Sequence, residues 1–349
     1  MSEMVTLLQT LSNCPGISGN ESAVRQSLRA FLVDHVDELH VDALGNLIAL
    51  KKGTGASALR VLVSAHMDEV GFMVVDHTAE GNLRVESVGG VNPQVLPGLL
   101  VSVGQDAIPG VIGIRAIHRI ESDDSSQVPS LKNLVVDIGS ASREEAARVA
   151  PPGTPVVFAT QSRDLGCSVS GKALDDRAGC TVLATLLKGE TFPFDLFGVF
   201  TVQEEVGLRG AGVAAYAVDP DVAIILEGTI ADDLPKPEQD VSPTTELGKG
   251  PAITVMDRSF IAPPRLVRHF IQTAEAAAIP YQLKQPGIGG TDAGSIHRAR
   301  EGVPSITVAV PCRYIHGPVS LLRTQDLEAA LKLVRLALET LTAEILSLV

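Results

Sequence analysis

Phe200-Thr201-Val202-Gln203-Glu204-Glu205-Val206-Gly207 closes an apolar, β-branched run that begins at Phe197, and two adjacent carboxylates stand where the run ends. Neighbouring side chains of a strand point to opposite faces, so a Glu-Glu pair does not suit the strand itself. Where the chain turns at the carboxyl end of a strand, both carboxylates can point into one cavity. One can then hold a metal ion while the other takes a proton from a water on that metal. An isolated pair of this kind is more often a solvated loop, so the interpretation depends on the rest of the chain.

The composition fits a well-packed α/β protein. The chain has 349 residues, of which 45% are hydrophobic and 32 are glycine, and this length favours two domains. Its 28 basic and 41 acidic residues give a net charge of −13, without a run of Lys or Arg. Nucleic acid and anionic membranes are therefore not expected partners. The four cysteines form no C-x-x-C motif and the N-terminus has no apolar leader, so we expect a reduced, cytoplasmic protein.

The beginning of the chain has the pattern of an α/β domain. Apolar residues at helical spacing predict helices over residues 3–13 and 20–38, with Ser18 or Asn20 as the cap of the second helix. The nearly continuous apolar run Leu59–Ala65 predicts a strand that is buried on both faces.

Residues 69–171 have a different pattern. They are rich in Val, Ile and Gly, are interrupted by frequent turn signals, and have helical periodicity only over Ser142–Val149. This pattern is typical of a small β-barrel or sandwich. The stretch Glu121–Ser130 is expected to be a polar, mobile loop. We therefore predict a β-domain of residues 69–171 inserted into an α/β domain made of residues 1–68 and 172–349.

Helices and strands alternate again after the insertion. The pattern predicts a helix over Asp176–Leu187, then strands over Phe197–Val202 and Val222–Leu226. A long terminal helix is expected from Thr324 to Leu348, capped by Thr324-Gln325-Asp326.

Metal-capable side chains stand at or near the ends of the predicted strands. They are His66, Asp175, Glu204-Glu205, Glu227 and His316. Each has an ordinary explanation when taken alone: His66 can be a buried, hydrogen-bonded histidine, and Asp175 can cap a helix and pair with Arg177. In open α/β sheets, however, sites gather at the carboxyl ends of strands. Two histidines with several carboxylates are typical of a two-zinc or two-cobalt hydrolase, in which a carboxylate bridges the metals.

These residues belong to short motifs that follow one another along the chain. The motifs are His66-x-Asp68, Leu174-Asp175-Asp176-Arg177-x-Gly179, Gln203-Glu204-Glu205-Val206-Gly207, Leu226-Glu227-Gly228-Thr229, Gly289-Gly290-Thr291-Asp292-Ala293 and Arg313-Tyr314-x-His316. In this order and spacing they resemble the M42 family of dinuclear metallo-aminopeptidases, which includes members that form tetrahedral particles. The resemblance covers nearly the whole chain. It implies a mixed-sheet α/β/α metallopeptidase domain with an inserted, barrel-like domain that mediates oligomerisation.

The resemblance also implies a ligand set for two divalent metal ions, zinc or cobalt. Asp175 would bridge the two metals. His66 and Glu227 would complete one metal site, and Glu205 and His316 would complete the other. Many relatives have Asp at the position of Glu227, and the longer side chain can still ligate.

Proton transfer is assigned by the same resemblance to Glu204. This glutamate would act as general base toward a metal-activated water and then as general acid toward the leaving amine. Asp68 would hold the imidazole of His66 in the correct tautomer. Asp292 is a candidate for binding the α-amine of a peptide substrate, and a helix N-cap is its alternative role.

The expected partners are peptide substrates and further copies of the chain, in a dimer or a dodecamer. Three other functions stay open. The first is a metal-dependent deacylase of N-acylated amino acids on a related two-metal core. The second is a glycosidase, because the family has also carried glucanase descriptions, although a carboxyl pair without metals normally suffices for that chemistry. The third is a catalytically silent assembly protein that keeps the fold.

Overall fold

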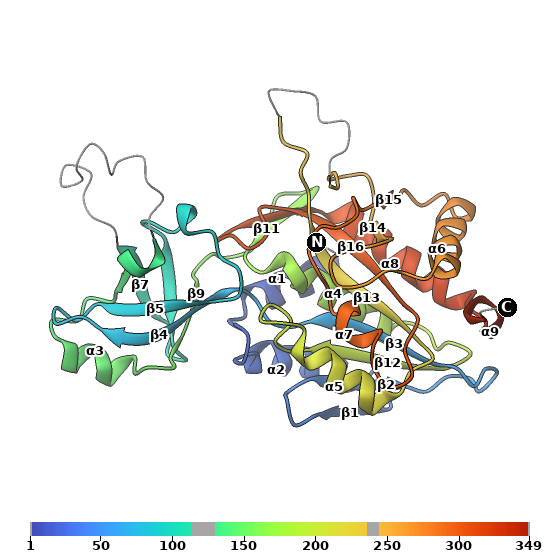
Figure 1. Cartoon of the computed structure of the whole chain (residues 1–349), viewed down its shortest axis with the longest axis horizontal. Coiled ribbons are helices and arrows are strands. Elements are labelled where there is room, and N and C mark those ends of the chain that lie inside the picture. Colours follow the sequence, from blue (N-terminus) through green and yellow to red (C-terminus); the bar gives the residue numbers. More distant parts are fainter. Residues whose placement is uncertain (1, 114–129, 236–243, 348–349) are drawn as a thin grey trace.

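A mixed β-sheet runs through the larger of the two bodies into which the chain folds (Figure 1). The computed structural model describes residues 2–113, 130–235 and 244–347. The strands of the sheet lie in the order β1-β2-β12-β3-β13-β16-β17-β11-β10, and the short pair β14 and β15 attaches to β16. Their bounds are β1 Glu38–Val41, β2 Leu47–Lys51, β3 Arg60–His66, β10 Arg163–Asp164, β11 Ser168–Gly171, β12 Asp195–Thr201, β13 Val222–Ile230, β14 Ala252–Thr254, β15 Gln282–Leu283, β16 Ser305–Arg313 and β17 Ser320–Arg323.

The centre of this sheet is parallel. β3 pairs in parallel with β12 and β13, and β13 pairs in parallel with β16. These strands are almost entirely buried, as expected for apolar runs covered on both faces. In the register of β3 and β12, His66 lies opposite Thr201, so both strands end at the same edge. The residues that follow them in the chain are therefore brought together.

Helices cover both faces of the sheet. On one face α4 packs against β3 and β13, α8 packs against β16, and α1, α2 and α6 pack around these two helices. On the other face α5 packs against β3 and β12, and α7 packs against β13 and β16. The bounds are α1 Glu3–Asn13, α2 Ser22–Leu32, α4 Leu174–Lys188, α5 Arg209–Val218, α6 Pro264–Ala276, α7 Ala293–Ile296, α8 Thr324–Glu339 and α9 Ala343–Leu346.

Two predicted helices end earlier than the apolar pattern indicates. α2 stops at Leu32 because the chain turns there to enter β1, which pairs with β2 in the sheet. The terminal helix stops at Glu339 and resumes only as the short α9. At this break the hydroxyl of Thr340 donates to the carbonyl of Leu336, and β-branched residues disfavour helix continuation.

Both predicted helix caps are also wrong. No side chain caps α2, and the hydroxyl of Ser18 instead donates to the carboxylate of Asp68. No side chain caps α8 either. The Asp326 carboxylate accepts hydrogen bonds from the backbone N–H groups of Gly248 and Gly250. In each case the polar side chain that the local pattern predicts as a helix cap forms hydrogen bonds with a distant segment instead.

The smaller body is a closed barrel (left in Figure 1). Its strands close in the order β4-β5-β8-β7-β6-β9, and Phe72 and Phe158 meet edge to face in its core with ring centroids 5.7 Å apart. The elements of the barrel are β4 Gly71–His77, β5 Leu83–Val88, η1 Pro93–Val95, β6 Leu100–Val103, β7 Ile108–Gly113, η3 Leu131–Asn133, β8 Val135–Asp137, α3 Arg143–Val149 and β9 Pro155–Phe158. The helix predicted over Ser142–Val149 is thus confirmed as α3, with Ser142 as its cap.

The chain returns to the large sheet before the predicted end of the insertion. β10 and β11 lie within the predicted β-domain, but β11 pairs with β17 of the large sheet. Of the predicted polar loop Glu121–Ser130, only Ser130 lies within the described residues.

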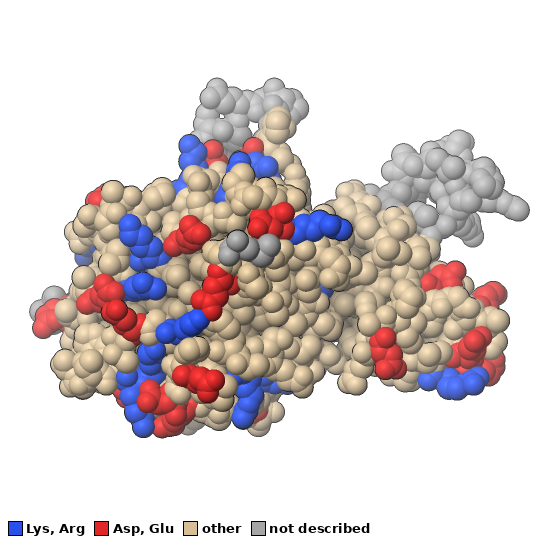
Figure 2. Space-filling view, turned by 180° about the vertical axis from the view of Figure 1, so that it is seen from behind, with Lys and Arg blue, Asp and Glu red and all other residues tan. Residues whose placement is uncertain are grey.

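No helix within the described ranges is long and apolar enough to cross a membrane. On the face shown in Figure 2, acidic and basic side chains are interspersed over both bodies.

Candidate metal centre

The candidate site lies at the carboxyl edge of the parallel strands. His66 is the last residue of β3, and Glu227 lies within β13, which is paired with β3. Glu204 and Glu205 follow the end of β12, and His316 follows β16. Gln203 has a positive φ of 57°, which turns the chain after β12 so that the two glutamates leave the line of the strand. The site is therefore formed by segments that are far apart in the sequence but adjacent in the sheet.

Asp175 lies between two clusters of potential ligands. In the first cluster, the Nε2 atom of His66 is 3.4 Å from Asp175 Oδ1 and 3.1 Å from Glu227 Oε1. In the second, the Nε2 atom of His316 is 3.5 Å from Asp175 Oδ2 and 3.4 Å from Glu205 Oε1. Within each cluster, one ligand atom from every residue lies within 4.8 Å of the others. The two oxygens of one carboxylate thus face two different histidines.

The backbone around Asp175 departs from a helix. Asp175 and Asp176 are joined by a cis peptide bond and have non-helical torsion angles, so regular helical conformation in α4 begins after them. The carboxylate of Asp176 accepts hydrogen bonds from the N–H groups of His66 and Gly179, so it is this aspartate that links the start of the helix to the end of β3. Asp175 is left to point into the site.

The carboxylates of the two clusters are buried together, and burial changes their acidity. Burial raises the pKa of Glu227 to about 8 and that of Glu205 to about 7. Burial alone would lower the pKa of His316, but Asp175 and Glu205 raise it to about 9. The pKa of Asp175 lies well below its usual range, because His316 and His66 outweigh the effect of burial. Protonated histidines thus supply the positive charge that buried carboxylates require.

A divalent cation fits this arrangement. Asp175 Oδ1 and Glu227 Oε2 are buried and have no hydrogen-bond partner, whereas buried polar atoms are normally paired. Imidazole nitrogens and carboxylate oxygens are the donors that zinc and cobalt accept. A cation beside His66 would displace its proton and would satisfy both unpaired oxygens, which belong to the cluster of His66.

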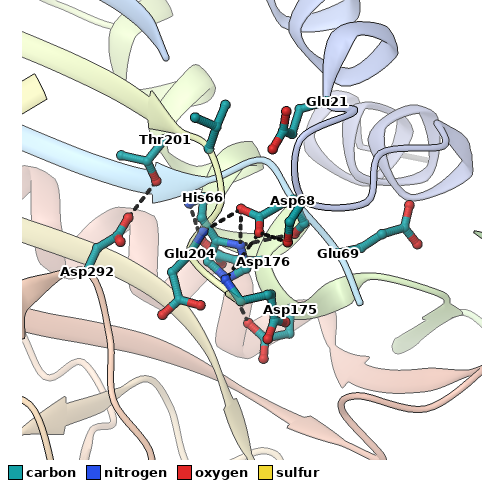
Figure 3. Close-up of polar contacts among 12 residues, drawn as sticks. Glu21, His66, Asp68, Glu69, Asp175, Asp176, Thr201, Glu204 and Asp292 are labelled. Atoms are coloured by element: carbon teal, nitrogen blue, oxygen red, sulfur yellow. Dashed lines mark hydrogen bonds and ion pairs between the residues drawn. The ribbon is translucent and has the colours of Figure 1, made fainter. Parts of the chain in front are cut away.

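Asp68 connects the strand end, the glutamate pair and the first loop of the chain (Figure 3). Its carboxylate accepts hydrogen bonds from the N–H groups of Glu204 at 3.0 Å and Glu205 at 3.1 Å. The hydroxyl of Ser18 donates to it at 2.6 Å. Burial would raise the pKa of Asp68, but hydrogen bonds from His66, Ser18 and the Glu204 N–H hold it below its usual value. The carboxylate therefore stays ionised and fixes the backbone from which both glutamates project.

The imidazole of His66 is oriented by the same residue. Its Nδ1 atom lies 3.0 Å from the backbone carbonyl of Asp68 and 3.5 Å from the Asp68 carboxylate. The carbonyl can only accept, so Nδ1 carries a proton and Nε2 faces Asp175 and Glu227. The closer partner of the ring is thus the carbonyl of Asp68, and the carboxylate mainly holds the glutamate turn.

Glu204 lies beside both clusters without belonging to either. It lines the cleft above the centre, and burial, together with the nearby charges of Glu227, Asp292 and Glu205, raises its pKa well above the usual value. A carboxylate with a raised pKa holds a proton more readily near neutral pH, which suits a group that accepts and returns one.

Asp292 is buried beside the end of β12. Its side chain is 1% exposed and is not among the residues that line the cleft. Nor does it cap α7 through its side chain. It accepts a hydrogen bond from the hydroxyl of Thr201, the last residue of β12, at 2.5 Å (Figure 3). Burial raises the pKa of Asp292 to about 6.

A buried ionic cluster next to the centre was not anticipated. Glu69 accepts hydrogen bonds from Lys172 at 2.6 Å, from the N–H of Gly16 at 3.0 Å and from Arg177 at 3.4 Å. Lys172 and Arg177 also donate to the carbonyl of Cys14. The cluster joins the chain segments on either side of the barrel to the loop after α1. Its only sequence signal is that Glu69 is the first residue of the predicted insertion and Lys172 directly follows its last residue.

The cleft above the centre has a volume of about 400 Å³. Apolar residues and one lysine lie beside the candidate ligands on its wall. The lining residues are His66, Asp175, Glu204, Glu205, Leu208, Glu227, Gly228, Thr229, Ile230, Lys284, Ile288, Gly289, Gly290, Thr291, Ile315 and His316.

Several known proteins are similar to this chain in sequence and in fold. A family model described as M42 glutamyl aminopeptidase matches residues 45–333. The lysyl aminopeptidase of Pyrococcus furiosus is 36% identical over 344 residues, which cover 96% of each chain. The solved TET aminopeptidase of the marine sediment archaeon Thaumarchaeota archaeon SCGC AB-539-E09 superimposes with a TM-score of 0.93, at 37% identity and 99% coverage of both chains. The TET1 peptidase of Pyrococcus horikoshii, which can assemble into a tetrahedron or a large octahedral shell, gives a TM-score of 0.85 at 33% identity, over 97% of this chain and 100% of that one.

The fold and these matches define a peptide hydrolase of the aminopeptidase class. The chain belongs to the M42 glutamyl aminopeptidase family, which confirms the resemblance drawn from its motifs. The predicted combination of a mixed-sheet α/β domain and a barrel is likewise confirmed. Peptidases of this family are metallopeptidases, and the described residues include histidine and acidic groups positioned to bind a metal ion.

The substitution Asp68→Asn tests the positioning role of the Asp68 carboxylate. The Glu204 and Glu205 N–H groups bind different oxygens of Asp68, and an asparagine keeps only one oxygen. The glutamate turn should therefore shift, and zinc affinity should fall by about 10–100-fold. Titration of the metal-free protein with zinc measures this.

Asp326→Asn is the matched control. This buried carboxylate also accepts from two backbone N–H groups, but they belong to Gly248 and Gly250, outside the metal centre. It should lower the melting temperature without changing zinc affinity. Equal zinc affinities for the two variants would contradict the role given to Asp68.

Proposed function

We propose that this chain is a two-metal aminopeptidase that releases N-terminal residues from peptides. The observation that supports this most strongly is the Asp175 carboxylate, whose two oxygens each face a separate histidine cluster. We assign Asp175 as the bridge between two divalent cations. His66 and Glu227 would hold one cation, and His316 and Glu205 the other.

When bound, the cations would supply a water of lowered pKa and positive charge for the carbonyl oxygen of the substrate. The remaining steps belong to the side chains of the cleft. The Glu204 carboxylate takes the proton of the attacking water and later delivers it to the nitrogen of the leaving amine. Glu204 lines the cleft and belongs to neither ligand cluster, which leaves its carboxylate available for this proton transfer.

Asp68 and Asp292 act from outside the cleft. The Asp68 carboxylate accepts hydrogen bonds from the N–H groups of both glutamates. It thereby fixes the turn from which Glu204 acts in proton transfer and Glu205 binds metal. Asp292 holds the hydroxyl of Thr201 at the end of β12, immediately before the glutamate turn. We therefore place Asp292 in a positioning role and leave the α-amine of the substrate to the metal centre or to the carboxylates of the cleft.

A metal-dependent deacylase on the same two-metal core is the alternative. The aminopeptidase names of the Pyrococcus furiosus and archaeal relatives favour the first function, because they share nearly the whole chain with this protein. A glycosidase is disfavoured, since the carboxylates Asp175, Glu205 and Glu227 are engaged by histidines.

A panel of aminoacyl-p-nitroanilides tests the proposed function. The protein is stripped with EDTA and then supplied with zinc, cobalt or manganese. Free-amine substrates should be cleaved only after metal is restored. Cleavage of N-acetylated amino acids, with silence on the free-amine panel, would contradict the proposal and select the deacylase.

The substitution Glu204→Gln should separate proton transfer from metal binding. Glu204 lies in neither ligand cluster, so the variant should keep both metals and lose at least about 100-fold in kcat. Glu205→Gln is the matched control, and it should lose metal. Metal analysis by mass spectrometry checks both variants. Loss of metal from Glu204→Gln would mean that the roles of the two glutamates are exchanged.

We also propose that the protein forms a homo-oligomer through its barrel. Leu100 and Val111 are cross-strand partners on β6 and β7, and their side chains are 64% and 40% exposed. Such a neighbouring apolar pair on a surface is typical of an interface. The shell-forming TET1 relative, which shares the barrel, supports the same interpretation.

Light scattering should therefore give a mass well above the 36.6 kDa of one chain at micromolar concentration. The substitution Leu100→Lys should lower that mass. Glu86→Lys, on the exposed face of β5 in the same barrel, is the control and should not. A monomeric wild-type protein would refute the proposal.

A further inference from the structure

A short turn of the barrel reaches the candidate metal centre. Gly89 and Gly90 follow β5 and precede η1, so they belong to the smaller body of the chain. The backbone carbonyl of Gly90 lies 3.0 Å from the Nδ1 atom of His316, although the two residues are 226 positions apart in the sequence. One of the candidate metal ligands is therefore hydrogen-bonded to the barrel and not to the sheet that carries it.

His316 is the least enclosed of the five candidate ligands. Its side chain is 38% exposed, whereas the side chains of the other four are at most 10% exposed. Its backbone has a positive φ of 58°, a conformation that residues other than glycine rarely adopt. Beyond the carboxylates of its own cluster, the Gly90 carbonyl is the one hydrogen-bond partner of its imidazole within the described residues. The orientation of this ring therefore depends on the barrel turn.

The hydrogen bond from His316 to Gly90 also decides which ring nitrogen faces the cluster. A carbonyl can only accept, so Nδ1 carries a proton and Nε2 is left to face the two carboxylates. Histidines that bind metals normally donate their other ring N–H in this way. The Gly90 carbonyl thus has the same relation to His316 that the Asp68 carbonyl has to His66.

The turn lies so close to the second cluster that its two residues have no room for side chains. A Cβ placed on Gly90 would lie 3.3 Å from the Nδ1 atom of His316. A Cβ placed on Gly89 would lie 3.3 Å from the Cβ of Glu205 and 2.8 Å from a methyl group of Val70. Carbon atoms pack best at about 3.5–4.0 Å, so each added Cβ would be crowded. Two adjacent glycines allow the turn to pack against both residues that complete the second cluster.

We propose that the Gly89-Gly90 turn of the barrel positions the ligands of the second metal site, so that the affinity of this site for a divalent cation depends on the barrel. The proposal rests on the two-metal centre of the proposed function. The first site should be independent of the turn, because His66 and Glu227 lie on strands of the large sheet and the ring of His66 is held by the Asp68 carbonyl. The barrel thus contributes to the metal centre in addition to the association proposed for it.

The substitution Gly90→Ala tests this role. The φ of Gly90 lies outside the positive region, so the backbone accepts alanine. Apart from the chain neighbours of Gly90, the described atoms within 4 Å of the added Cβ belong only to the ring of His316. The substitution should therefore displace this ring. Zinc affinity should fall by about tenfold at one of the two sites and change by less than about twofold at the other.

Calorimetric titration of the metal-free full-length protein with zinc measures the two affinities, and diffraction assigns them to their sites. Crystals of the wild type and of Gly90→Ala are equilibrated at a zinc concentration that just fills both sites of the wild type. In the variant, the anomalous peak beside Glu205 and His316 should lose occupancy, and the peak beside His66 and Glu227 should keep it. Loss at one site only is what distinguishes a positioning role from general destabilisation.

A second variant and a matched control complete the experiment. Gly89→Ala should weaken the same site, because it crowds Glu205 and places alanine at a φ of 79°. Gly113→Ala, at the end of β7 in the same barrel, is the control. Its φ is not positive and its added Cβ has its nearest described neighbours at 3.7 Å, so it should bind zinc at both sites as the wild type does. Melting temperature verifies that each variant is folded.

The outcomes separate the role of the turn from the two-metal centre itself. Unchanged affinities and two fully occupied peaks in Gly90→Ala would overturn the role of the turn and leave the two-metal centre standing. Equal weakening of both sites would mean that the substitution acts through the fold as a whole, and it would also overturn that role. A wild-type protein that binds fewer than two zinc ions per chain would overturn the two-metal centre of the proposed function.

Discussion

Burial of several carboxylates around two histidines is the constraint on which the site depends. Asp175, Glu205 and Glu227 approach one another at the end of the sheet, where like charges repel. Without cations, protonated His66 and His316 balance part of this charge, and the pKa values of both glutamates rise. Two divalent cations would relieve the same conflict more completely, since each provides two positive charges and accepts nitrogen and oxygen donors.

The fold supplies this arrangement through parallel strands that end together. His66 and Thr201 are opposite each other in the register of β3 and β12, so the segments that follow them start from the same edge. Asp68 then ties these segments to one another by accepting from the backbone of Glu204 and Glu205, and Ser18 ties Asp68 to the loop before α2. The strands determine which part of the sheet edge each side chain occupies, and buried hydrogen bonds determine its orientation there.

Much of the fold and most of the candidate site follow from the sequence, because they depend on local patterns. Apolar runs predict β3, β12 and β13, and polar groups at the ends of such runs point to the sheet edge. The side chains of the five candidate ligands lie together in two groups that share Asp175. Their side chains cluster because of the order of the strands in the sheet.

What the sequence did not reveal depends on contacts between distant segments. Ser18 satisfies the local rule for a helix cap, yet its hydroxyl serves Asp68. Asp292 stands before a helix, yet its side chain turns inward to Thr201. Lys284 has no sequence pattern that predicts its place on the wall of the cleft. Side-chain partners of this kind are decided by tertiary packing, which neither spacing nor propensity encodes.

The measurement that tests the account most directly is a crystal structure of the zinc-loaded protein with diffraction data collected on both sides of the zinc absorption edge. Anomalous difference density should contain two peaks per chain, one beside His66 and Glu227 and the other beside Glu205 and His316, with Asp175 touching both. A single peak that excludes one of the histidines, or zinc bound without contact to Asp175, would contradict the proposed two-metal centre.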